Sequence, residues 1–482
     1  MFDYAVIAAA QCILLVAVVI LREPKLLIPA VVLGLPMEYL ETETFQSLGS
    51  SGIQGAARSL LNPGQAAMVA TVIVAIVRNR HNLGRLFPDS SLLLPLTLLA
   101  TVQFIGVAWS DSLKPSNSVL ILPLYIGFIF AAPSLIENRR DLERIVGAFF
   151  LAAGLLAALA AAQRIFGIFN WREVLIHSDE FSYRSNATFA DPNNLARFLA
   201  LAMSLGAGVI LATGPRRQTL YLAVPMWCAG AIGIVATASR SGWLMLVLCT
   251  FLVVLMSPIP RYTKARITVA CVGGMLLALG LLLAQGGADA DRVKSLTSGV
   301  SVLGQRTFLI NAGWQMFVHN PIVGVGSGNY QHSLVTTYLY LVPDWARTTL
   351  SHTSLISLVA ELGLMGLALF LFVALRIMIT LVRTYFATDV PYNRLMIGWL
   401  ASSLIGILLV SQSEGRLFDE PYLWVLFAIT IAVETSPKLA GRKRDDLTPG
   451  AVGAPARRPE RGPRSAAVAA AMLSASTEAN PS

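Results

Sequence analysis

The sequence predicts an all-α fold, a polytopic membrane helix bundle with one large external loop that contains short helices. Of its 482 residues, 55% are hydrophobic and only 13% are charged, and the mean hydropathy is +0.65. A soluble protein of several domains is less apolar than this. Apolar runs of about 17 to 25 residues, the length that crosses a bilayer as a helix, recur from Tyr4 to Glu434.

We expect about thirteen transmembrane helices, with twelve as the alternative because the second and the last apolar runs are short. The runs are centred near Leu14, Val31, Val72, Leu98, Gly127, Leu155, Met203, Gly230, Val247, Leu277, Leu367, Ser403 and Leu426. A mostly polar stretch from Gln285 to Ser351 separates two of them and forms the external loop. Beyond Lys438 the chain is rich in Pro, Gly, Ala and Arg, a composition that buries too little apolar surface to fold.

These features predict three segments. The first holds the N-terminal transmembrane helices over residues 1–188, and the second is a core over residues 189–434 that includes the external loop 285–351. The third is a disordered cytoplasmic tail over residues 435–482.

Basic residues gather in alternate loops, and this predicts the orientation because loops rich in Lys and Arg stay in the cytoplasm. The basic loops carry, in chain order, Arg22 and Lys25, Arg78 and Arg80, Arg139 and Arg140, Arg216 and Arg217, Arg261 and Lys264, and Arg383 and Arg394. The alternation places loop 285–351 on the outer face of the membrane. The net charge of +9 arises mostly from these loops and the tail, so it does not indicate nucleic-acid binding.

Arg240 is the first candidate site residue on the outer side. It lies in Thr237-Ala-Ser-Arg-Ser-Gly-Trp243, where two predicted helices meet with almost no loop between them. An arginine at a helix start opposes the helix macrodipole, so it costs stability unless an anion lies nearby. The alternative is an arginine that extends to the lipid headgroups.

Arg306 is the second candidate, at the start of a predicted helix over Gln305 to Val318. An apolar stripe at helical spacing indicates a helix on or just above the membrane surface, and it consists of Phe308, Leu309, Ala312 and Met316. Arg306 is then either a ligand of an anion or a solvated charge on that helix.

His352 is the third candidate, at the amino end of the next apolar helix. The helix dipole disfavours a charged imidazolium there, and nearby arginines act in the same direction, so we expect a neutral ring that can accept a proton. The alternative is a histidine that only caps the helix.

Asn193 is a weaker candidate, in Phe189-Ala-Asp-Pro-Asn-Asn194. Asp191 and Pro192 have a structural explanation as the cap and first turn of a helix, but Asn193 has none. Four arginines make this outer segment basic, which would attract an anionic substrate, although scattered solvated charges are the more common explanation. They are Arg164, Arg172, Arg184 and Arg197.

Three other patterns are not assigned to the site. Gly324-Val-Gly-Ser-Gly328 lacks the Lys-Ser/Thr ending of a phosphate loop and is interpreted as a tight turn. Asp289 and Asp291 resemble a metal-binding pair, but nothing suggests the nucleotide-binding sheet that would accompany it. Glu361 is expected inside a spanning helix, where an acid is costly, and on the face opposite His352.

Together, several of these motifs resemble the O-antigen ligase and O-antigen polymerase superfamily. They are Ser239-Arg240, Arg306, the turn His319-Asn-Pro-x-x-Gly-x-Gly326, and His352-Thr followed by nine residues, Gly363, two residues and Gly366. The resemblance extends from about Phe189 to Gly366. Thr353 stands where the ligase branch has Asn, Ser or Gln, which favours a polymerase over a ligase.

The resemblance implies a metal-independent glycosyltransferase of the bacterial inner membrane with its active site on the periplasmic side. Its donor is an oligosaccharide on a polyprenyl diphosphate carrier, and its acceptor is a hydroxyl group of a glycan or glycolipid. No cofactor or metal is expected. Arg240 and Arg306 bind the diphosphate, Asn193 assists them, and His352 is the catalytic base.

A flippase or other transporter of lipid-linked glycans is the alternative function. Such a protein is expected to carry charges deep within several helices and to consist of two symmetric halves. Neither feature is found in the sequence, so glycan transfer is the preferred prediction.

Overall fold

The computed structural model describes residues 23–38, 62–111, 117–169, 184–213, 217–269, 273, 300–343, 353–414, 417–436 and 439. The described part of the chain contains helices and no strand, which agrees with the all-α prediction. The α-helices are α2 Leu27–Gly34, α5 Pro63–Arg78, α6 Leu93–Ile105, α7 Asn117–Leu120, α8 Leu122–Ala131, α9 Arg139–Phe166, α11 Pro192–Thr213, α12 Arg217–Thr237, α13 Arg240–Met256, α16 Val300–His319, α17 Tyr330–Thr336, α18 Ser354–Ala387, α19 Pro391–Glu414 and α20 Pro421–Thr435. Short 3-10 helices are η1 Pro24–Leu26, η2 Leu83–Leu86, η3 Gly106–Trp109, η4 Ala132–Leu135 and η5 Leu339–Leu341.

The predicted apolar runs correspond to helices wherever the structure describes them. The runs centred near Leu14 and Leu277 lie outside the described residues, and each of the other centres falls within an α-helix. Three described helices are long and apolar enough to cross a membrane, namely Arg139–Phe166, Ser354–Ala387 and Pro391–Gln412. Several further apolar helices are shorter, so the total of thirteen stays a prediction.

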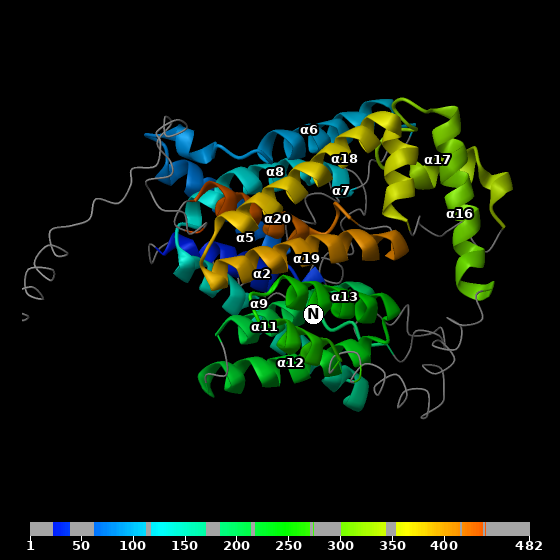
Figure 1. Cartoon of the computed structure of the whole chain (residues 1–482). Coiled ribbons are helices and arrows are strands. Elements are labelled where there is room, and N and C mark those ends of the chain that lie inside the picture. Colours follow the sequence, from blue (N-terminus) through cyan, green and yellow to red (C-terminus); the bar gives the residue numbers. More distant parts are fainter. Residues whose placement is uncertain are drawn as a thin grey trace, which may run out of the picture. The chain divides into compact units, whose positions relative to one another are not determined.

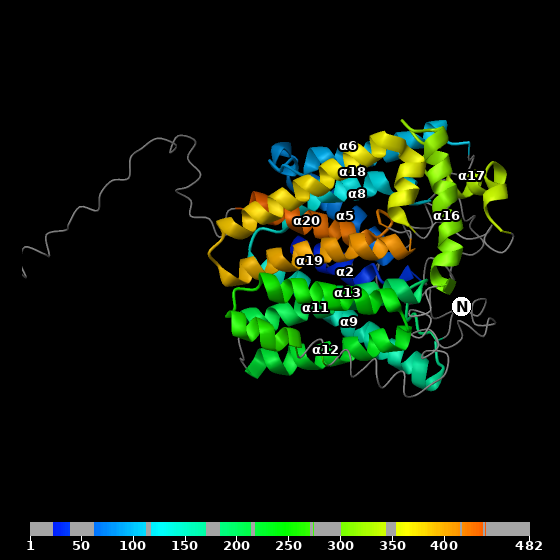
Figure 2. The same ribbon diagram turned by 45° about the vertical axis from the view of Figure 1, so that its right-hand side comes forward.

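Helix α11 lies at the centre of the packing that positions the site. It packs against α9, α12, α13 and α19, as Figures 1 and 2 both show. Phe198 of α11 stacks on Phe149 of α9 with ring centroids 5.7 Å apart, and Trp399 of α19 meets Phe149 edge-on. Gly242 lets α13 approach closely, because a Cβ there would lie 2.4 Å from Ala196 Cβ. The starts of α11 and α13 are therefore held together.

Segments that the sequence assigns to one side of the membrane meet at one end of the bundle. At the first end, which we call the basic end, Lys25 Nζ lies 2.8 Å from Glu137, and Ser91 donates to Glu434. At the opposite end, which we call the loop end, Thr188 donates to Pro36 O. These contacts agree with the alternation of basic loops.

Part of the predicted external loop folds as a small helical unit at the loop end. Helix α16 runs crosswise to α13 and α19 (Figures 1 and 2) and packs on α17 and α18. The unit has its own apolar core, made of Leu309, Ala312, Met316, Tyr330, Leu334, Tyr338, Val342 and Ala360. Three members of the predicted apolar stripe, Leu309, Ala312 and Met316, belong to this core, whereas the Phe308 side chain is 42% exposed.

Helix α18 is interrupted at Gly363, where the backbone has φ 61° and ψ −153°. Essentially only glycine adopts this conformation, and a Cβ there would lie 2.5 Å from backbone atoms of Ile322. The interruption separates a short first segment, residues 354–362, from the longer helix that runs along the bundle in Figure 1. Hydropathy cannot reveal such a break, since the residues on both sides are apolar.

Candidate functional site

Asn193 joins the starts of two helices at the loop end. Pro192 begins α11, and the side chain of Asp191 accepts a hydrogen bond of 2.8 Å from the Asn193 backbone N–H. Ser239 caps α13, and its hydroxyl donates to Asn193 Oδ1 at 2.7 Å while accepting from the Gly242 N–H at 3.2 Å. The side chain of Asn193 therefore lies where both helices present their amino ends.

The orientation of the Asn193 amide is fixed by its neighbours. Its Oδ1 accepts from Arg184 Nη2 at 2.6 Å as well as from Ser239. Because a guanidinium only donates, the atom that faces it must be the oxygen. The Nδ2 group then points elsewhere, and it donates to no residue that the structure describes. The partly exposed amide thus offers an oriented donor to a ligand.

Arg184 also holds the turn between α12 and α13. Its Nε donates to Thr237 O at 2.9 Å, and the next residue in that turn, Ala238, has a positive φ of 48°. Arg240 follows as the first residue of α13 and is partly exposed. The starts of two arginine-bearing segments and the positive ends of two helix dipoles therefore lie close to the acids Asp191 and Glu38, whose carboxylates accept from backbone N–H groups of Asn193 and Ala190. The two arginines balance the two acids, and the dipole ends leave the place positive, which favours an anionic ligand.

The interpretation of Arg184 and Arg197 as scattered solvated charges was wrong. The Arg197 side chain is 1% exposed, and its Nη1 lies 2.7 Å from Glu420 Oε1, whose side chain is 2% exposed. Arg197 also donates to Asn194 Oδ1 at 3.2 Å. This buried pair joins α11 to the start of α20 directly behind the Asn193 cluster.

Two supporting residues were missed in the sequence. Gln163, near the end of α9, accepts from the backbone N–H groups of Asn186 and Ala187 and holds Ala187 at a φ of 47°. Glu420 directly precedes Pro421 at the start of α20, and an acid followed by proline is a signal for a helix start that points to this position.

Arg306 and His352 are placed only through their helices. Arg306 lies on α16, but its side chain is outside the described part, and His352 itself lies outside the described residues. Thr353 is the N-cap of α18, so His352 immediately precedes that helix, as expected. Helix α16, which carries Arg306, packs on α18, the helix that begins two positions after His352 in the chain. The convergence of Arg306 and His352 with Arg240 stays a prediction.

The turn after His319 is confirmed as a structural element. Gly324, Gly326 and Gly328 all have positive φ, and a Cβ on Gly324 would lie 2.3 Å from the backbone of Glu361. Backbone hydrogen bonds join this turn to α18 on both sides of its break, from Val325 N to Ala360 O and from Leu364 N to Pro321 O. The glycines of the two sequence motifs thus hold each other in place.

Glu361 lies within the helix Ser354–Ala387, which is long and apolar enough to cross a membrane, as the sequence predicts. It belongs to the short segment before Gly363, and its carboxylate accepts from the backbone N–H groups of Gly328 at 3.0 Å and Tyr330 at 3.2 Å. The acid therefore fixes the glycine turn and the start of α17.

His319 is likewise explained by the local structure. Its Nδ1 lies 2.9 Å from the hydroxyl of Tyr338, and the two rings are stacked with centroids 5.7 Å apart. Burial, and secondarily Tyr340, raises the pKa of Tyr338. The phenol therefore stays protonated and the pair stabilises the loop unit.

The acids Asp289 and Asp291 lie outside the described residues.

Comparison with known families confirms the resemblance seen in the motifs. Residues 224–371 match the family model described as O-Antigen ligase. The matched segment contains Arg240, Arg306 and His352 together with the glycine turn and Gly363, whereas Arg184 and Asn193 precede it. No curated protein matches the chain in sequence.

Proposed function

We propose, from the O-antigen ligase domain at residues 224–371, that this protein transfers a glycan from a polyprenyl diphosphate carrier to an acceptor hydroxyl at the periplasmic face of the bacterial inner membrane. The observation that carries the proposal is Arg240, which lies inside the matched segment as the first residue of α13. It directly follows Ser239, whose hydroxyl donates to the oriented amide of Asn193. An arginine at the amino end of a helix, close to an amide donor, can bind the negatively charged diphosphate of a lipid-linked donor.

The proposed reaction uses the three predicted site residues Arg240, Arg306 and His352. The acceptor oxygen forms a bond to the anomeric carbon while the bond from that carbon to the diphosphate oxygen breaks. Negative charge grows on the departing diphosphate, where the guanidinium groups of Arg240 and Arg306 stabilise it. The proton of the acceptor hydroxyl passes to the neutral ring of His352. Attack opposite the leaving group inverts the anomeric centre.

Substitution of Arg240 or Arg306 by alanine tests the proposal. Each variant should lower the rate of glycan transfer by about 10²–10³-fold, as expected for the loss of a charge that stabilises the leaving group. The measurement uses purified protein in proteoliposomes with a polyprenyl-diphosphate glycan, and excess EDTA should leave the wild-type rate unchanged. Arg80→Ala, at the basic end, is the control.

Full activity of both arginine variants in correctly inserted protein would refute the proposal. The same assay identifies the subtype by its product, because a polymerase lengthens the glycan on its carrier whereas a ligase moves the glycan to a glycolipid. Thr353 leads us to expect lengthening. Translocation of the labelled carrier without transfer would instead indicate the flippase.

Asn193→Asp separates ligand binding from structure. The aspartate keeps an oxygen where Arg184 and Ser239 donate, but it replaces the free Nδ2 donor by a second acceptor. Transfer should fall by about 10–150-fold, the value of one hydrogen bond to a charged group, and thermal stability in detergent should change little. An active Asn193→Asp protein would show that the amide serves only to join α11 and α13.

A further inference from the structure

A groove at the basic end lies outside everything used by the proposed reaction. Its volume is about 580 Å³, and it lies between the chain leading into α2 and the last turns of α5. Glu23 and Lys25 line one side, and Ile73, Val74, Val77 and Arg78 line the other. The size suits a small ligand or part of a lipid.

One wall of the groove is apolar and faces away from the protein interior. Ile73 is 55% exposed and Val77 is 58% exposed, whereas the opposite side of α5 buries Ala67, Met68 and Ala75. In a helix of a membrane bundle, such an outward apolar surface contacts acyl chains. The groove therefore opens toward lipid along this wall.

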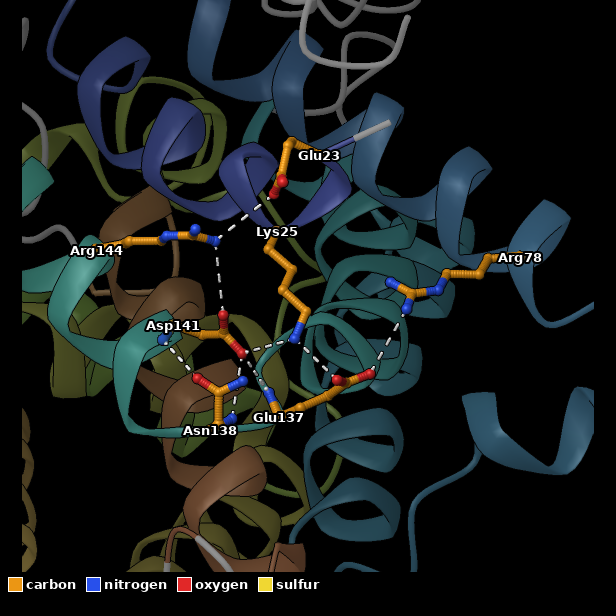
Figure 3. Close-up of polar contacts among 7 residues, drawn as sticks. All are labelled: Glu23, Lys25, Arg78, Glu137, Asn138, Asp141 and Arg144. Atoms are coloured by element: carbon orange, nitrogen blue, oxygen red, sulfur yellow. Dashed lines mark hydrogen bonds and ion pairs between the residues drawn. The ribbon is translucent and has the colours of Figure 1, made fainter. Parts of the chain in front are cut away.

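Arg78 lies at the polar end of the groove, and its N–H groups donate to no residue in the described part of the chain. Figure 3 shows Lys25 between Glu137 and Asp141, at 2.8 and 3.2 Å, so its charge is balanced within the protein. Arg78 reaches Glu137 only at 3.8 Å, its side chain is 44% exposed, and it makes no hydrogen bond within the described chain. The exposed, planar guanidinium of Arg78 can therefore donate hydrogen bonds to two oxygens of one phosphate.

The neighbouring charges favour an anion at Arg78. Glu23 lines the groove, but its carboxylate lies 3.8 Å from Arg144 Nη1, and Figure 3 shows it directed to that arginine. Arg85 of η2, which packs on α5, adds a positive charge to this end of the bundle. At the face predicted to be cytoplasmic, basic groups of this kind attract anionic headgroups.

We infer that this groove binds one anionic phospholipid of the adjacent leaflet, with its phosphate on Arg78 and the first part of an acyl chain against Ile73 and Val77. The lipid phosphate contacts α5, while Glu137, the partner of Arg78, is bound to Lys25. The bound lipid thus strengthens the ionic cluster that joins Lys25 of η1, Arg78 of α5 and Asp141 of α9 through Glu137.

Native mass spectrometry of the delipidated full chain with added phosphatidylglycerol tests the inference. The wild type should retain one tightly bound phosphatidylglycerol and gain thermal stability from it, and phosphatidylcholine and inorganic phosphate should each have a much smaller effect. Arg78→Gln should weaken the binding about tenfold, the loss of one charge-assisted contact. Val77→Trp should weaken it as well, since the ring fills the groove without changing the charge.

Arg80→Gln is the matched control, because this exposed side chain lies two residues away and does not line the groove. It should bind phosphatidylglycerol as the wild type does. Equal binding by Arg78→Gln and wild type, an equal effect of phosphatidylcholine or inorganic phosphate, or no retained lipid in the wild type would each overturn the inference. None of these readouts depends on glycan transfer.

Discussion

Replacement of His352 by alanine should reduce the rate of glycan transfer by about 10²–10⁴-fold, the usual contribution of a positioned general base. The acceptor hydroxyl must lose its proton as it attacks, and among the predicted site residues only His352 accepts a proton near neutral pH. Binding of the donor should persist, because the diphosphate is held by the arginines. A rate assay together with a donor-binding assay distinguishes the two steps.

The control is His332→Ala, which removes an exposed imidazole from α17 in the same loop unit. This variant should transfer glycan at the wild-type rate. The wild-type rate should also decrease as the pH is lowered below about 6.5, the pKa of an ordinary histidine, because the helix dipole and the arginines delay protonation of the ring to a lower pH and a protonated ring is no longer a base. A His352→Ala protein with normal turnover, or a wild-type rate that does not change in this pH range, would show that His352 is not the catalytic base.

Replacement of Arg197 by alanine should have the largest effect on stability. It leaves the carboxylate of Glu420 without its partner at a site where the acid is only 2% exposed. Loss of one member of a buried ion pair costs about 3–5 kcal/mol, because the remaining charge is neither hydrated nor neutralised. The measurement is the thermal unfolding temperature of the protein in detergent.

The double variant Arg197→Met with Glu420→Met provides the internal control. It removes both charges and keeps apolar volume, so most of the lost stability should return. A single Arg197→Ala variant that unfolds within a degree of the wild type would mean that the pair contributes nothing. Unfolding of the double variant at the same low temperature as the single variant would assign the effect to lost packing.

The positions of the helices could be predicted because a membrane-spanning helix requires a continuous run of apolar residues, which is visible in the local sequence. Runs centred near Leu155, Leu367 and Ser403 are long and apolar, and each lies in a described helix. The break at Gly363 could not be predicted from hydropathy, since it depends on backbone contacts with Pro321 and Ile322.

The candidate site could be predicted only in part. Asn193 stood out because neither capping nor turn geometry required it, and its amide does join two helices. Arg197 was misinterpreted because its partner, Glu420, is 223 positions away in the sequence, and only the fold brings them together. Arg184 likewise appeared as one charge among several until its contacts with Asn193 and Thr237 were known.

An experimental structure with a nonreactive polyprenyl-diphosphate donor analogue tests the central claim most directly. The account predicts that the diphosphate lies at the loop end near the start of α13, within hydrogen-bond distance of Arg240 and Arg306, with His352 facing the anomeric carbon. A diphosphate bound elsewhere, or the Arg306 and His352 side chains directed away from Arg240, would contradict it.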